Sequence, residues 1–362
     1  MVMKKNEVNN KLRQVFLDSC SENLKLQDPL GYMPSGHNGS YIDEETPVRN
    51  TAHWIVSFVK AYELTKDKSF YNAIIIGLDF LKDEILRPSR KTFICREKES
   101  KDKCNGLIGQ AWVIEGLMAG YRVTQDKDVL DLASEVFLLH PFSEKKNMWY
   151  RVEPTGAVLT LDKTFNHQLW FAMSGFLIIK AQQNKEIENR CLRFFNVISE
   201  NLKLSNNGRI GQSVKLGFKE DVIKYNLKRI VRKNELQYIK LKEIGYHAFN
   251  TYAFSIIYDL YPNLKFFKTN DYRKIINYIN SSEYKNNIYN SNYGFKYNPP
   301  GFEVLKTYNT HESILNNSVE FIDGLLNFHL ENNYDNMKCS FTRNVHDKNT
   351  SAARIYELSS SF

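Results

Sequence analysis

The sequence predicts an all-α protein whose helix hairpins close into an (α/α)6-type toroid. One observation is a recurring unit of polar loop, apolar helix, short turn and amphipathic helix. A second is an internal repeat, because AYELTKDKSF at Ala61 aligns with GYRVTQDKDV at Gly120, a period of about sixty residues. Helices that are apolar on nearly all sides and alternate with half-exposed helices predict two concentric layers. An open stack of the same hairpins, an α-solenoid that would serve as a protein adaptor, is the alternative architecture.

The helices are expected in chain order from an amphipathic first helix at Asn9–Leu26. A long loop, Pro29–Pro47, separates this helix from the repeated hairpins. The hairpins are expected at Asn50–Leu64 with Ser69–Leu86, Cys104–Thr124 with Val129–Leu139, Phe165–Lys180 with a helix reaching Leu204, Gly245–Tyr261 with Asp271–Ile279, and Thr310–Leu330. These pairs leave the sixth hairpin to be formed by the N-terminal helix and the C-terminal segment, and the alternative is an incomplete ring.

Two insertions interrupt this pattern. Residues 206–220 contain glycines and alternating apolar residues, which predict a small β-hairpin, and a basic helix follows. Ser281–Thr310 is the second insertion, and a short helix is expected around Ala352–Leu358. We therefore predict one domain over residues 1–362, with clear hairpin repeats at 49–330 and closing segments at 1–48 and 331–362.

Composition limits the classes of function. With 42% hydrophobic and 25% charged residues the chain is globular, and its net charge of +8 favours an anionic partner such as an acidic glycan. No zinc finger, aromatic RNA-binding motif or basic heptad region is present, so nucleic acid is not an expected partner. Five scattered cysteines without a CxxC pair indicate reduced thiols. Because no signal segment and no transmembrane segment is visible, we expect a cytoplasmic protein.

Polar side chains recur where the buried helices begin. In a toroid these starts converge on one cleft, so we predict a binding site there. A single histidine in a buried helix is more often a hydrogen-bonded core residue, but recurrence across the repeats favours a functional interpretation of the set. The spacing contains no HExxH or other metal-binding pair, so neither a metal nor a cofactor is expected. The predicted substrate-binding residues are Arg49, His53, Asn105, Gln110, Trp170, Asn250, Tyr297, His311 and Glu312.

Three kinds of chemistry fit these residue types. Glycoside hydrolysis needs two carboxyl groups, for which Asp162, Glu303 and Glu312 are the best-placed acids. Uronate elimination or C5-epimerisation needs a base for the proton next to a carboxylate, and a group that neutralises that carboxylate. Non-catalytic glycan binding needs no acid pair. The predicted catalytic residues are His167, Tyr246, His247, Glu303 and Asp162.

Three segments carry a resemblance to a known superfamily, namely NGLIGQAWVIEGLMAGYRVTQDKDVLDLA at Asn105, FNHQLWFAMSG at Phe165 and GYHAFNTYAFSII at Gly245. They resemble the six-hairpin α/α toroids, which include unsaturated glucuronyl hydrolases, heparinase-type and alginate-type lyases, glucuronyl C5-epimerases and sugar 2-epimerases. YNPPGFE at Tyr297 and TSAARIYEL at Thr350 are similar to segments of proteins from bacterial surface-polysaccharide gene clusters. The paired catalytic aspartates of the glucuronyl hydrolases have no match in the sequence.

The resemblance and the residues together predict a carbohydrate-active, bacterial-type enzyme. We expect it to cleave a glycosidic bond, as a hydrolase or a lyase, in an acidic, uronate-containing surface polysaccharide or its precursor. A uronyl C5-epimerase is one alternative. A non-catalytic glycan-binding component of capsule or O-antigen biosynthesis is another, and other polysaccharide-biosynthesis proteins are the expected protein partners.

Overall fold

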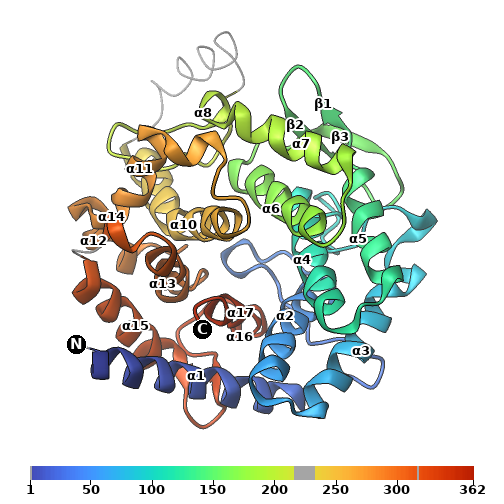
Figure 1. Cartoon of the computed structure of the whole chain (residues 1–362), viewed down its shortest axis with the longest axis horizontal. Helices are drawn as coiled ribbons and strands as arrows, with labels where there is room; N and C mark the ends of the chain where they lie inside the picture. Colours follow the sequence, from blue (N-terminus) through green and yellow to red (C-terminus); the bar gives the residue numbers. More distant parts are fainter. Residues whose placement is uncertain (1, 216–232, 316–317) are drawn as a thin grey trace.

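The computed structural model describes residues 2–215, 233–315 and 318–362, and its helices form two concentric layers (Figure 1). Each inner helix contacts the next around the ring, from α2 through α4, α6 and α10 to α13. The inner helices are α2 (Val48–Thr65), α4 (Gly106–Thr124), α6 (Phe165–Ala181), α10 (Lys233–Leu260) and α13 (Pro300–Thr310). The outer helices are α1 (Val2–Leu24), α3 (Lys68–Lys82), α5 (Lys127–Leu138), α7 (Lys185–Asn196), α11 (Asn270–Asn277) and α15 (Val319–Asn333).

The C-terminal segment closes the ring between α13 and α2. α17 (Tyr356–Ser359) contacts both of these helices, α16 (Lys348–Ala353) contacts α2, and α1 packs outside α2. Figure 1 shows the two short helices inside the ring and α1 along its outer edge. Ile355 and Leu358 in this segment are fully buried. The predicted toroid is therefore confirmed, and the first helix and the C-terminal segment fill the sixth position.

The repeated turns share one backbone geometry, which explains the internal sequence repeat. α2 is followed by Lys66 and α4 by Gln125, both in the left-handed conformation with φ of 60° and 55°. The aspartates that come next, Asp67 and Asp126, accept backbone N–H groups at the starts of α3 and α5. Each turn therefore ends one helix with a left-handed residue and caps the next helix with an aspartate.

α4 is buried on nearly every side, as its composition predicts. Its close approach to α2 depends on Gly116, where a Cβ atom would lie 2.8 Å from the Cα atom of Ala52. A larger residue would push the two inner helices apart. Their N-terminal ends, which carry polar side chains, are thus held side by side.

The strands are short and antiparallel. β1 (Phe142–Ser143), β2 (Met148–Val152) and β3 (Val158–Leu161) form a sheet between α5 and α6, and β4 (Tyr334–Asp335) pairs with β5 (Ser340–Phe341). The β-hairpin expected near 206–220 corresponds to one antiparallel bridge between Leu204 and Ile210, while residues 216–220 lie outside the described residues. The sheet at 142–161 was not predicted, because strands this short give too little alternation to recognise.

The remaining helices connect the hairpins. They are α8 (Ile198–Asn201), α12 (Ser282–Asn287), α14 (Glu312–Leu315) and the 3₁₀ helices Gly39–Tyr41, Glu84–Leu86, Pro88–Arg90, Lys265–Lys268, Tyr278–Asn280 and Ile288–Asn290. Over the described ranges, no helix combines the length and the apolar character needed to cross a bilayer.

Two helix boundaries differ from the prediction. The fifth inner helix begins at Pro300 and not at Thr310, because proline suits the first turn of a helix, where its missing N–H is not needed. His311 therefore lies between the end of α13 and the short α14, and it does not open a buried inner helix. α10 is described from Lys233 and runs through Gly245, so the predicted start of the fourth buried helix lies inside a longer helix. Part of the predicted basic helix lies outside the described residues.

Candidate active site

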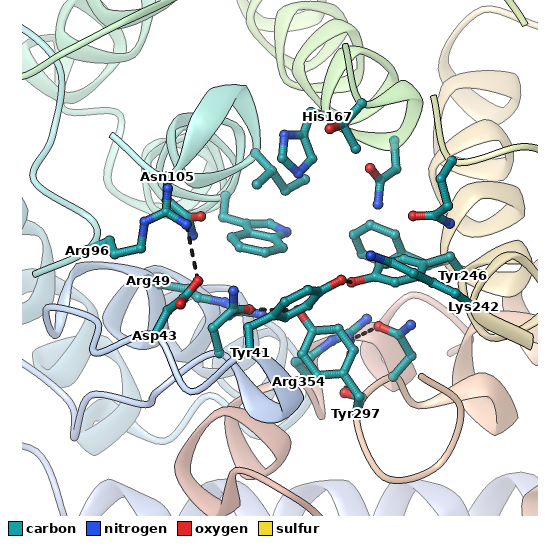
Figure 2. Close-up of a pocket in the computed structure, with 18 of the residues that line it drawn as sticks. Tyr41, Asp43, Arg49, Arg96, Asn105, His167, Lys242, Tyr246, Tyr297 and Arg354 are labelled. Carbon is teal, nitrogen blue, oxygen red and sulfur yellow. Dashed lines mark hydrogen bonds and ion pairs between the residues drawn. The ribbon is translucent and has the colours of Figure 1, made fainter. Parts of the chain in front are cut away.

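A cavity of about 220 Å³ lies where the inner helices begin (Figure 2). α2, α4, α6 and α10 each contribute side chains, and the loops before α2 and α13 and the C-terminal segment complete the wall. The helix starts therefore converge on one cleft, as the sequence predicts, and this cavity is that cleft. Its lining residues are Asn38, Tyr41, Asp43, Arg49, Arg96, Lys101, Asn105, Ile108, Trp112, Thr164, Asn166, His167, Gln212, Lys242, Tyr246, Phe249, Tyr297, Asn298 and Arg354.

His167, in the first turn of α6, forms a dyad with Asp162. The Nδ1 atom of His167 lies 2.9 Å from Oδ2 of Asp162, which also accepts the backbone N–H of Leu107. Burial raises the pKa of Asp162, but His167 and the N–H groups of Thr164 and Leu107 outweigh it and lower the pKa to about 2. The ionised carboxylate fixes Nδ1 as the donor, so Nε2 is the nitrogen available to a ligand in the cavity.

The turn before α4 makes room for this dyad. Asn105 and Gly106 both have a left-handed backbone, with φ of 57° and 61°. A Cβ atom on Gly106 would lie 2.8 Å from Nδ1 of His167 and 2.9 Å from Oδ2 of Asp162. Glycine is therefore required here both by the backbone conformation and by the packing of the dyad.

A pair of tyrosines lies across the cavity from the dyad. Figure 2 shows His167 on one side and Tyr41 with Tyr246 on the other. The two hydroxyl oxygens are 2.9 Å apart. Burial, assisted by neighbouring tyrosines such as Tyr297, raises the pKa values of Tyr41 and Tyr246 well above their usual value. Both phenols therefore hold their protons at neutral pH.

Two buried arginines form the floor of the cavity. Arg49 donates from Nη1 to both carboxylate oxygens of Glu45 at 3.1 and 3.2 Å, and its guanidinium lies 3.9 Å from the centre of the Trp112 ring. Arg354 donates to Glu303 and to Glu357, each at 2.8 Å. Each floor arginine thus has its charge balanced by buried carboxyl groups.

The rim carries a second group of charges. The Asp43 carboxylate, with a side chain only 1% exposed, accepts from Lys101 at 2.6 Å and from Arg96 at 3.3 Å. Burial raises the pKa of Asp43, but Lys101, Lys98 and Arg96 outweigh it and lower the pKa. Lys242 lies opposite, against tyrosine rings, and forms no ion pair with a carboxylate in the described part of the chain.

The structure brings part of the predicted site together. Arg49, Asn105, His167, Tyr246 and Tyr297 line the cavity, and Asp162 lies directly behind His167.

Three predicted histidines lie elsewhere and have core contacts. His53 is 1% exposed and stacks on Tyr356, with ring centres 4.6 Å apart. His247 is fully buried, and its Nε2 lies 2.9 Å from the carbonyl oxygen of Ile275. His311 follows the C-terminal end of α13, away from the helix starts, and contacts the hydroxyl of Tyr272.

The predicted amide and tryptophan ligands outside the cavity have structural partners. Gln110 is fully buried and bridges the backbone N–H and carbonyl groups of Phe93. Trp170 stacks under Phe249, with ring centres 4.4 Å apart. Asn250 donates to the carbonyl oxygen of Tyr246, one turn earlier in the helix.

The remaining predicted acids are also outside the cavity. Glu303 is fully buried behind Arg354, and Glu312 lies exposed beyond the C-terminal end of α13. The position of Glu312 follows from the corrected start of that helix at Pro300.

Several lining residues are not among the predicted site residues. Tyr41 and Asp43 belong to the long loop before α2, whose mixed polar and aromatic composition was the available signal. Lys242 was missed because it precedes the predicted start of the fourth buried helix, and Arg354 because its segment predicts only ring closure. Within the described ranges, no three His, Cys, Asp or Glu side chains are grouped to hold a metal ion.

Comparison with known proteins shows the family and the fold. The chain is 36% identical over 360 residues to archaeal glycosylation protein Q from Haloferax volcanii, covering 96% of both sequences. No protein-family model matches the chain.

Among solved structures, cellobiose 2-epimerase from Bacillus thermoamylovorans matches with a TM-score of 0.68 and 13% identity over 99% of both chains. An unsaturated glucuronyl hydrolase specific for heparin matches with a TM-score of 0.60 and 11% identity over 97% of this chain and 95% of the other. The predicted resemblance to the six-hairpin carbohydrate-active toroids is therefore confirmed at the level of the fold.

Proposed function

The chain belongs to the family of archaeal glycosylation protein Q, and from this premise we propose that it is a uronate C5-epimerase acting on an acidic glycan under assembly. One observation carries the proposal. A histidine–aspartate dyad and a pair of protonated tyrosines face the same cationic cavity from two sides (Figure 2).

The dyad supports proton removal. The hydrogen at C5 of a uronate is next to the carboxylate and is a weak acid, so its removal needs a positioned base. With Nδ1 of His167 held by the ionised Asp162, Nε2 is free to accept that proton. The same carboxylate then stabilises the imidazolium that forms.

The tyrosine pair supports proton return on the opposite face. Because burial keeps the hydroxyl of Tyr246 protonated, it serves as an acid, and Tyr41 is hydrogen-bonded to it at 2.9 Å. A base on one side and an acid on the other invert the configuration of the carbon between them. Elimination would use the same base, but its acid would protonate the oxygen that leaves C4, whereas epimerisation returns a proton to C5 itself.

The charges of the cavity support an anionic substrate. Removal of the C5 proton places negative charge on the carboxylate oxygens, and preorganised cations stabilise such charge most in a site that excludes water. Arg49, Arg96, Lys101, Lys242 and Arg354 all line the cavity.

Hydrolysis by two carboxyl groups has weaker support. Asp43 is the sole carboxyl side chain among the described residues that line the cavity. Its ion pairs with Lys101 and Arg96 keep it ionised, so it cannot protonate a leaving group. Glu303, the second predicted acid, lies behind Arg354.

The experiment is solvent-isotope exchange. Oligosaccharides ending in glucuronate, galacturonate or mannuronate are incubated with the protein in deuterated water, and deuterium at C5 is measured by NMR. We expect incorporation accompanied by the C5 epimer. His167→Gln and Tyr246→Phe should each lower the rate by about 10²–10⁴-fold. His346→Gln, which changes an exposed histidine outside the cavity, is the matched control.

Other outcomes would contradict the proposal in distinct ways. An unsaturated uronate, detected by its ultraviolet absorbance, would show a lyase. A new reducing end without exchange would show a hydrolase. Binding without either reaction would show a glycan-binding component of the assembly pathway.

A further inference from the structure

Two ammonium groups lie over one aromatic ring at the cavity rim. The Nζ atoms of Lys101 and Lys242 lie 5.6 and 5.0 Å from the centre of the Tyr41 ring. Both residues line the cavity, and Figure 2 shows Lys242 beside Tyr246 and Tyr41. They come from distant parts of the chain, so their approach is a property of the folded ring.

These cations are not balanced in the same way as the floor arginines. Arg49 is paired with Glu45, and Arg354 with Glu303 and Glu357. At the rim, Asp43 is shared between Lys101, Lys98 and Arg96, and Arg96 is also paired with Asp102. Lys242 has no carboxylate partner among the described residues, and its ammonium group lies against tyrosine rings. An excess of positive charge therefore remains at the rim, close to Tyr41.

Burial and the neighbouring ammonium group of Lys101 both lower the pKa of Lys242. Two like charges held near each other are unfavourable unless an anion lies between them. A bound anion would stabilise the charged forms of both lysines.

The size of the cavity limits what carries this anion. At about 220 Å³ it is smaller than the roughly 300–1,000 Å³ of pockets that enclose drug-sized ligands. A cavity of this size suits one sugar residue, so we assign the anionic group to that residue.

We propose that Lys101 and Lys242 form an anion clamp over the Tyr41 ring, which holds the carboxylate of the one uronate residue in the cavity and selects acidic over neutral sugars. This inference rests on the proposed function, because it assigns the carboxylate of the same substrate. The clamp neither gives nor takes the transferred proton, and its role in binding is to select the acidic sugar.

The test measures binding and not turnover. Matched probes that differ only at C6, namely D-glucose, D-glucuronate and D-glucose 6-phosphate, and the corresponding galacto and manno series, are titrated by calorimetry. We expect at least one uronate to bind at least about tenfold more tightly than its neutral hexose and than its 6-phosphate. Lys242→Met and Lys101→Met should each remove most of the preference for the uronate over the neutral hexose. Lys242→Arg, which keeps the positive charge, should retain part of that preference.

Lys98→Met is the matched control. Lys98 and Lys101 both have side chains 37% exposed and both bind Asp43, at 3.1 and 2.6 Å, but Lys98 does not line the cavity. The control should therefore keep the preference for the uronate. Added salt should weaken uronate binding and leave neutral-sugar binding unchanged.

Several results would overturn the clamp. These are equal binding of uronate and hexose, binding of none of the uronates, tighter binding of the 6-phosphates, or an equal loss in Lys98→Met and Lys101→Met. Lysine-dependent uronate binding without isotope exchange would contradict the epimerase and leave the clamp intact.

Discussion

Nδ1 of His167 lies 2.9 Å from Oδ2 of Asp162, and the same oxygen accepts the backbone N–H of Leu107 at the start of α4. The dyad therefore joins the start of α6 to the start of α4, two neighbouring inner helices. His53 and His247 also lie in inner helices, but Arg49 donates to Nε2 of His53, Nε2 of His247 bonds the Ile275 carbonyl oxygen, and neither histidine lines the cavity. A histidine of this ring is a candidate base only if a carboxylate binds one of its ring nitrogens and the other nitrogen is exposed to the cavity.

Asp162→Asn should lower the exchange rate by about 10²–10⁴-fold. An asparagine can present its amide N–H₂ to Nδ1, which places the imidazole proton on Nε2 and removes the base. The protein should remain folded with a modest loss of stability, because the oxygen in the Oδ1 position still accepts from Thr164, whereas the N–H₂ in the Oδ2 position no longer accepts from Leu107. Exchange rates and thermal unfolding, measured on the same preparations, check both parts. An unchanged exchange rate would show that the dyad does not orient the base.

Gly106→Ala should cost about 1 kcal/mol or more of stability and should also lower the exchange rate. The added Cβ would lie 2.8 Å from Nδ1 of His167, and the backbone has a φ of 61°. Gly324→Ala is the control, because a Cβ added there, inside α15, would have no described neighbour outside its own helix within 4 Å. That change should be neutral or slightly stabilising. Equal effects from the two substitutions would contradict the proposed role of Gly106.

The inner helices and the cleft could be predicted because they follow from local patterns. Apolar periodicity and the repeated turn chemistry identify the ring, and position at a helix start selects Arg49, Asn105 and His167. Tyr246 and His247 show where this reasoning fails. Consecutive helical residues do not share a face, so one lines the cavity and the other enters the core.

The rest of the site depends on how the ring closes. Arg354 comes from a segment that is polar in sequence and reaches the cavity only because it fills the gap between α13 and α2. Lys242 faces the cavity because α10 begins before the predicted boundary. Neither contact is encoded in a local pattern, since both are set by packing between distant segments.

Acid should destabilise the protein from about pH 6.5 downwards, because several histidines are buried as neutral groups. Burial lowers the pKa of His247 to about 3, of His329 to about 3 and of His140 to about 4. Below about pH 6.5, the ordinary pKa of histidine, these side chains take up protons in the unfolded chain but not in the folded chain. The free energy of unfolding therefore falls as the pH falls below that value. Each histidine should cost about 2 kcal/mol at about pH 5.

His247→Gln tests this dependence. A glutamine N–H₂ can replace the hydrogen bond to the Ile275 carbonyl oxygen, but it does not titrate. Urea unfolding gives the free energy of unfolding at neutral pH and at about pH 5. Between these two pH values, the variant should lose about 2 kcal/mol less of this free energy than the unsubstituted protein. Equal losses would contradict a neutral, buried His247. Isotope exchange should continue, since this residue lies outside the cavity.

Arg354→Met should destabilise the protein by about 3–5 kcal/mol, because it leaves the buried Glu357 carboxylate without its cation and the Glu303 carboxyl group without its hydrogen-bond donor. Glu303→Gln should cost only about 1 kcal/mol. Burial and the neighbouring Glu357 raise the pKa of Glu303 well above its usual value, so the glutamine replaces a carboxyl group that is already neutral. The free energies of unfolding of the two variants are compared by urea denaturation, and the comparison requires that their m-values are equal. If Glu303→Gln were as damaging as Arg354→Met, Glu303 would have to be ionised, and the charge balance of the cavity floor would differ from the one described.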